Sequence, residues 1–106
     1  MKRYEIKKAR MCVARLYLPV FDKHNYIIIH YSEKIVETMT EEEKKPLKIL
    51  DATEFAELNV RKILERDNIE NLSFEEMRIV QNSIFEAYSI YDREQERVIG
   101  YLEDYE

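Results

Sequence analysis

The segment from Leu72 to the C-terminus constrains the fold most, because it carries a helix start followed by a long periodic row of apolar residues. Residues 73–76 have the pattern of a capping box, in which the Ser73 hydroxyl can accept from the Glu76 amide and the Glu76 carboxylate can accept from the Ser73 amide. The row that follows advances in alternating steps of three and four, broken only at Glu94, and comprises Met77, Val80, Ile84, Ala87, Tyr91, Val98, Tyr101 and Tyr105. The sequence therefore predicts one amphipathic helix of about 30 residues, about 45 Å long at 1.5 Å per residue.

The length and composition are those of one soluble domain. The chain has 106 residues, of which 45% are hydrophobic and 37% are charged. We expect residues 1–106 to form a single domain, because a second core would not fit. No apolar run approaches the roughly 18 residues of a membrane span, and the N-terminus lacks an apolar leader. The single cysteine, Cys12, cannot form an internal disulfide, so we expect a cytoplasmic protein.

A second helix start lies at Asp51. Asp51 is placed as the N-cap, Glu54 occupies the third position, and Leu50 can pack against Phe55 as a hydrophobic staple. The apolar residues that follow share one face and include Ala56, Val60, Ile63 and Leu64. The pattern predicts a helix over residues 51–67. The short loop to the next helix start then favours an antiparallel helix pair.

The N-terminal third is open to two interpretations. Residues 26–31 are rich in β-branched and aromatic side chains, and residues 11–20 can pair with them as a β-hairpin. The alternative is all-α, with residues 3–18 and 26–39 helical. We favour the hairpin, followed by a short helix over residues 32–39 and a charged turn or single helical turn over residues 40–48.

Together these elements predict an α+β domain that is predominantly helical, with the hairpin packed on the C-terminal helix pair. The long helix extends beyond what its partner helix can cover, so its second half needs another apolar surface. We therefore expect a homodimer, with an interface formed by Tyr91, Val98, Tyr101, Leu102 and Tyr105. Tyrosine is common at such interfaces because it is large and amphipathic.

Nothing in the sequence indicates catalysis or a bound cofactor. Asp22, His24 and His30 are the most conceivable metal ligands, but a turn aspartate and two surface histidines are the simpler interpretation. The many glutamates fit solvated faces, and Cys12 fits a small core residue. A single glycine, Gly100, excludes glycine-rich phosphate loops in their usual form. We therefore expect no catalytic, cofactor-binding or metal-binding residues and no enzymatic activity.

The charge is distributed unevenly along the chain. Residues 1–15 carry six cations against Glu5, a net charge of +5, so residues 16–106 sum to −10 because the whole chain is −5. The basic start either packs on the acidic remainder or binds nucleic acid. The residues available for nucleic acid are Lys2, Arg3, Lys7, Lys8 and Arg10.

These observations lead to two hypotheses about function. The first is a non-catalytic regulatory or protein-interaction protein, acting through the long amphipathic helix and the acidic surface. Small acidic proteins of this build are frequent among viruses and mobile elements, so we include such an origin in the hypothesis. The alternative is a nucleic-acid-binding regulator that uses the basic N-terminal segment.

Overall fold

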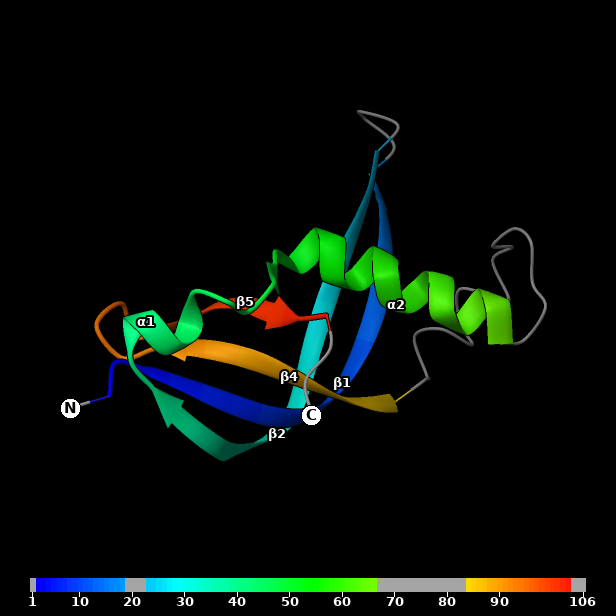
Figure 1. Ribbon diagram of the computed structural model, residues 1–106. Coiled ribbons are helices and arrows are strands. Elements are labelled where there is room, and N and C mark those ends of the chain that lie inside the picture. The colour runs from blue at the N-terminus through cyan, green and yellow to red at the C-terminus, as the bar shows by residue number, and fades with distance from the viewer. Residues whose placement is uncertain (1, 19–22, 67–83, 104–106) are drawn as a thin grey trace.

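The computed structural model describes residues 2–18, 23–66 and 84–103. They form a five-stranded antiparallel sheet and two helices (Figure 1). The elements are β1 (Tyr4–Leu18), β2 (Lys23–Met39), α1 (Glu41–Lys44), β3 (Ile49–Leu50), α2 (Ala52–Arg66), β4 (Ile84–Asp92) and β5 (Arg97–Leu102). The strand order is β2-β1-β4-β5-β3, so among the described residues β2 and β3 are the edge strands. The prediction of a predominantly helical domain is wrong, and so is the all-α alternative.

The N-terminal β-hairpin is confirmed, but it is much longer than predicted. β1 and β2 pair from Tyr4 opposite Met39 to Leu18 opposite Lys23, with irregularities in register between Ile6 and Lys7 and between Arg10 and Met11. The short helix predicted over residues 32–39 is wrong, because β2 continues through this segment. Its β-branched residues favour a strand when a neighbouring strand is present, and β1 supplies that neighbour.

The long C-terminal helix is also wrong. Residues 84–92 form β4, which pairs with β1 from Asp92 opposite Tyr4 to Ile84 opposite Cys12. Residues 97–102 form β5, which returns beside β4 after a polar turn. Five of the nine residues of β4 are β-branched or aromatic, which favours a strand, and β1 supplies the neighbouring strand without a second subunit. The capping box at residues 73–76 lies outside the described residues.

Both helices that the structure describes begin where the sequence predicts. The Thr40 hydroxyl accepts from the Glu43 amide at 3.3 Å and starts the single turn of α1. The Asp51 carboxylate accepts from the Glu54 amide at 2.8 Å and starts α2, as the capping pattern indicates. However, α2 packs on the sheet, and the helix partner predicted for it is absent from the described residues.

One face of the sheet, which we call the helix face, is covered by α2 (Figure 1). The buried side of α2 consists of Phe55, Ala56, Val60 and Ile63. These side chains pack against β1, β5 and neighbouring strands in two clusters that include Ala9, Met11, Val13, Phe85 and Tyr101. The Phe55 ring stacks on the Tyr101 ring with centroids 4.7 Å apart. Burial of large apolar side chains of this kind contributes about 1.5–3 kcal/mol each.

The opposite face, which we call the crossover face, is only partly covered. The chain must pass from β2 at one edge to β3 at the other, and residues 40–50 make this crossing. Leu47 and Ile49 from this segment pack on a cluster formed by Tyr4, Ile6, Met39, Ile90 and Leu102. The end of the crossover face near Tyr4 is therefore buried. The end near Cys12 has no such cover among the described residues.

Candidate functional site on the crossover face

The uncovered end of the crossover face carries large exposed apolar side chains. Ile29 and Ile84 both pair with Cys12 in the sheet, so the three side chains lie in one row on the same face. Ile27 lies on this face two residues before Ile29, and Tyr31 interacts with the Cys12 thiol from β2. The exposed fractions are 44% for Ile27, 44% for Ile29, 57% for Tyr31 and 50% for Ile84. We call these four residues the apolar patch.

Cys12 forms the floor of the apolar patch. Its side chain is only 1% exposed. Burial raises the pKa of the Cys12 thiol, and a hydrogen bond with Tyr31 acts in the opposite direction. A thiol with a raised pKa stays protonated at neutral pH and is a poor nucleophile. Cys12 therefore supports the patch by packing, as the sequence indicates, and the chemistry of the patch is that of an apolar surface.

Positive charge lies directly beside the apolar patch. In the next row of the crossover face, Arg10 of β1 lies between Ser32 of β2 and Glu86 of β4. In the row after that, Lys8 lies between Lys34 and Tyr88. We call these the basic rows. Lys8 donates to Glu86 at 2.9 Å, which raises the pKa of Lys8 and lowers the pKa of Glu86. Arg10 and Lys34 are exposed, and among the described residues neither forms an ion pair within 4.0 Å.

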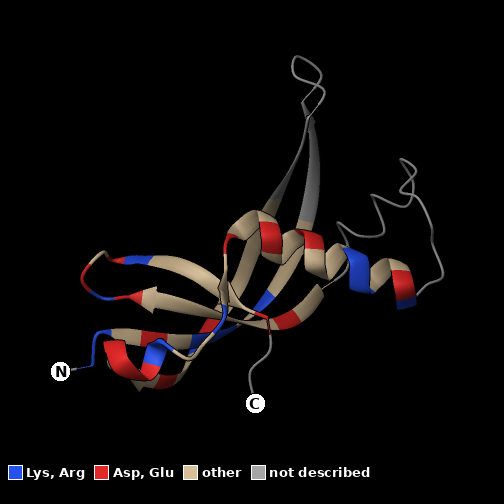
Figure 2. Ribbon diagram, turned by 45° about the horizontal axis from the view of Figure 1, so that its top comes forward, with Lys and Arg blue, Asp and Glu red and all other residues tan. Residues whose placement is uncertain are grey.

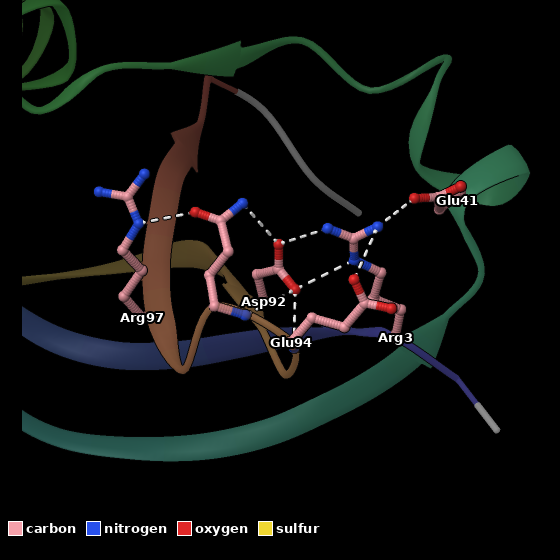
Figure 3. Close-up of polar contacts among 6 residues, drawn as sticks. Arg3, Glu41, Asp92, Glu94 and Arg97 are labelled. Carbon is pink, nitrogen blue, oxygen red and sulfur yellow. Dashed lines mark hydrogen bonds and ion pairs between the residues drawn. The ribbon is translucent and has the colours of Figure 1, made fainter.

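A different polar cluster lies at the far end of the sheet, around the buried carboxylate of Asp92 (Figure 3). Asp92 accepts from Arg3 Nε and Nη2, each at 3.1 Å, and from the Glu94 amide at 2.9 Å. Gln95 Nε2 donates to the same carboxylate at 2.9 Å. The hydrogen bond from Arg3 holds the pKa of Asp92 below its ordinary value and raises the pKa of Arg3.

This cluster shapes the turn between β4 and β5 and ties it to α1. Arg3 also forms ion pairs with Glu41 of α1 and with Glu94, the latter at 3.2 Å. Glu96 completes the turn with a φ of 53°. An open depression of about 540 Å³ beside Arg3 is lined by Thr40, Glu41, Glu42 and Glu94. Because carboxylates dominate its walls and Arg3 is already paired, the depression is poorly suited to an anion, and we interpret the cluster as structural.

A third polar group joins β2 and β5 across the helix face. His30 Nε2 of β2 and the Tyr101 hydroxyl of β5 share a hydrogen bond of 3.0 Å. Glu33 Oε1 lies 3.1 Å from His30 Nδ1 but outside hydrogen-bond alignment, and Lys7 Nζ donates to Glu33 at 3.3 Å. Burial and the Glu33 charge raise the pKa of Tyr101.

His30 and Tyr101 can meet because the strands between them carry small side chains at this level. Ala9 of β1 lies opposite Ala87 of β4, and Ser89 lies opposite Tyr101. The hydrogen bond therefore fastens β2 to β5 over two intervening strands. The Ser89 hydroxyl oxygen is buried and has no hydrogen-bond partner among the described residues. This group was missed at the sequence level, because no spacing in the chain relates residue 30 to residue 101.

The five cations proposed for nucleic acid do not form one surface. Strand alternation places Lys7 on the helix face and Lys8 and Arg10 on the crossover face. Lys2 donates to Glu43 at 2.8 Å, and Arg3 is held by Asp92. Lys7 and Lys8 pair with Glu33 and Glu86. Thus four of these cations lie against carboxylates of the same molecule.

The residues predicted to form a helical interface lie in strands instead. Tyr91 and Val98 are half-buried, and Tyr101 and Leu102 are buried on opposite faces of the sheet. Tyr105 lies outside the described residues. Because the long helix does not exist in residues 84–103, the row that required a second subunit is largely covered within the chain. The reason for expecting a helix-mediated homodimer is therefore lost.

The residues considered as metal ligands are not brought together in the part of the chain that is described. Asp22 lies outside it, and His30 is engaged by Tyr101. No group of three His, Cys, Asp or Glu side chains suited to a metal occurs within residues 2–18, 23–66 and 84–103. In the same residues no helix is both long and apolar enough to span a membrane.

Comparison with protein-family models, curated proteins and solved structures gave no match. The fold and the surface therefore define the class of this protein: a small α+β protein whose antiparallel sheet, within the described residues, is covered by α2 on one face and only partly covered on the other. Figure 2 shows acidic residues on both helices.

Proposed function

We propose that this chain is a non-catalytic protein-interaction protein that docks a partner on the apolar patch. The observation that carries the proposal is the exposure of four large apolar side chains at one end of a sheet face whose other end is buried. Contiguous apolar surface on a soluble protein commonly marks an interaction site. Each of these side chains is already about half buried, so covering all four would contribute about 4 kcal/mol before the cost of association.

The polar clusters of the described residues support this proposal by their internal pairing. The Asp92 carboxylate accepts hydrogen bonds from five donor atoms, and His30 Nε2 and the Tyr101 hydroxyl share a hydrogen bond. These groups hold the turn and the sheet together. The nucleic-acid hypothesis gains no support, because four of the five N-terminal cations named for it form ion pairs within the chain.

A photo-crosslinking residue at a single position tests where the partner docks. We would place p-benzoylphenylalanine at position 29, in the middle of the apolar patch, and irradiate the protein in an extract of its source cells. The control has the same residue at position 57, where Glu57 is exposed on α2. We expect a covalent adduct with another polypeptide from position 29 and little or none from position 57.

The fold of both labelled variants would be checked by circular dichroism against the unlabelled chain. Equal adduct yields from the two positions, or no adduct from position 29, would contradict docking on the apolar patch. An adduct formed with a second copy of the chain would support docking but would identify the partner as the chain itself.

A further inference from the structure

The electrostatics around the apolar patch differ from those of the whole molecule. The basic rows hold Lys8, Arg10 and Lys34 against one carboxylate, Glu86, which gives a local charge of +2. The whole chain has a net charge of −5. Positive charge is therefore concentrated beside the apolar patch on an otherwise acidic protein. Arg10 and Lys34 are the cations of these rows that face solvent without an ion pair among the described residues.

The spacing of these features defines what could lie across them. Successive side chains on one face of a strand are about 7 Å apart, so the basic rows lie about 7 and 14 Å from the row of Ile29, Cys12 and Ile84. The width from β2 to β4 is about 10 Å, which matches the diameter of one helix. A helical segment lying along β1 would thus meet apolar side chains first and cations about 1.3 and 2.6 turns later, at 5.4 Å per turn.

We propose that the partner docked on the apolar patch is an acidic amphipathic segment of another protein, an inference that rests on the docking function proposed above. Its apolar side chains cover Ile27, Ile29, Tyr31 and Ile84, and its carboxylates pair with Arg10 and Lys34. The apolar contact supplies most of the affinity, whereas the two exposed ion pairs select for an acidic partner and strengthen binding by a few-fold each.

The same observations disfavour other anionic partners. A nucleic acid offers no aliphatic side chains to cover the apolar patch, and its affinity depends on neutralising many phosphates. The field of an anionic membrane acts on the charge of the whole protein, so a chain with a net charge of −5 is repelled by it. The electrostatic contribution to the binding of a short peptide comes from charges within a Debye length of about 8–10 Å. The cations beside the apolar patch therefore determine that contribution.

Fluorescence anisotropy with two matched peptides tests the inference. The acidic probe is a fluorescein-labelled 16-residue peptide with leucine at every third or fourth position, four glutamates between them and alanine elsewhere. The neutral probe has glutamine in place of each glutamate. We expect the acidic probe to bind the wild-type chain about 10-fold more tightly than the neutral probe at ~50 mM salt. This advantage should disappear at ~500 mM salt, where exposed ion pairs are screened.

Two variants connect the binding to the named residues. The double variant Arg10→Glu/Lys34→Glu should lose the roughly 10-fold preference for the acidic probe and still bind the neutral probe. The variant Ile29→Ser should weaken both probes. The matched control is Arg61→Glu, which reverses an exposed cation on α2 and should leave both affinities unchanged.

The other possible outcomes distinguish a failure of the acidic-partner inference from a failure of the docking function. If both probes bind equally, or if Arg10→Glu/Lys34→Glu keeps the preference, the acidic partner is excluded while docking on the apolar patch stands. If neither probe binds, the inference fails, and the crosslink from position 29 decides the docking function by itself. If vesicles with ~30% phosphatidylserine bind through Arg10 and Lys34 while the probes do not, the surface is a membrane contact and the inference fails.

Discussion

At the scale of single residues, Gly100 on β5 shows how closely the crossover segment lies on the sheet. A Cβ at this position would be 2.1 Å from Ile49 Cγ2 and 2.9 Å from the Leu50 carbonyl oxygen. The side chain and backbone of β3 would both have to move. We expect Gly100→Ala to lower the free energy of unfolding by about 1–3 kcal/mol, measured by urea unfolding.

The Ile49→Ala variant provides the control for this prediction. It removes Cγ2, the atom nearest to the added methyl group. The remaining Ile49 Cβ lies 3.6 Å from that methyl group, an ordinary van der Waals distance. The cost of Gly100→Ala should therefore be smaller in the Ile49→Ala background than in the wild type. Equal costs in the two backgrounds would show that Ile49 is not what limits this position.

Asp92 gives a prediction about pH. Its pKa is below the ordinary value of 3.8, chiefly because Arg3 donates hydrogen bonds to the charged carboxylate. A group whose folded-state pKa is lowered contributes stability that is complete above the unfolded-state pKa and is lost as pH falls through the folded-state pKa. We expect the wild type to exceed Asp92→Asn in urea midpoint at pH 5–7, and the difference to shrink as pH falls below 3.8.

The comparison variant for Asp92 is Glu57→Gln, which removes one carboxylate from an exposed position on α2. Its urea midpoint should stay close to that of the wild type over the same pH range. A difference between wild type and Asp92→Asn that does not change with pH would mean that the Asp92 charge is not what stabilises the turn.

At the scale of elements, α2 should depend on one aromatic contact. Phe55 is buried against the sheet, and its ring stacks on Tyr101 at 4.7 Å. We expect Phe55→Ala to lower the free energy of unfolding by about 3–5 kcal/mol, since it leaves a cavity between α2 and β5. Leu58→Ala, at a half-buried position of the same helix, should cost clearly less. Similar costs for the two variants would contradict the packing of α2 on β5.

The elements that could be predicted from sequence are those with local signals. Asp51 and Thr40 start helices because their side chains cap amides three residues away, and no distant contact is needed. The hairpin of β1 and β2 is likewise formed between neighbours in the chain. The sequence shows Ile27 and Ile29 as part of a continuous apolar strand. Which face of that strand is covered depends on the whole sheet and could not be predicted.

The C-terminal strands were misinterpreted because their pattern fits two periods. The segment has apolar residues at steps of three and four, which fit a helix, and other apolar residues at alternate positions, which fit a strand. Both faces of β4 carry large side chains. The deciding contact is with β1, which lies about 80 residues earlier in the chain for the pair Lys8 and Tyr88. The break at Glu94 was the one local sign of the turn between β4 and β5.

At the scale of the whole molecule, the charge pattern along the sequence becomes a pattern of ion pairs in space. Lys2, Arg3 and Lys8 lie beside Glu43, Asp92 and Glu86, all far away in the chain. The basic N-terminus therefore packs largely on the acidic remainder, which is one of the two interpretations that the sequence left open. Only the arrangement of strands shows that Arg10 and Lys34, unpaired among the described residues, share a face with the apolar patch.

The solution mass tests whether the apolar row of β5 is core or interface. Leu102 is 3% exposed and packs on Ile6 and Ile90, so an aspartate there would be buried without a partner. We expect the wild type to have the mass of one chain by light scattering at ~10 and ~200 µM, and Val98→Asp/Leu102→Asp to unfold. A dimeric wild type whose double variant is a folded monomer would instead place β5 at a subunit interface. A dimer that dissociates only with Ile29→Ser would show that the apolar patch binds a second copy, contradicting the acidic partner proposed for it.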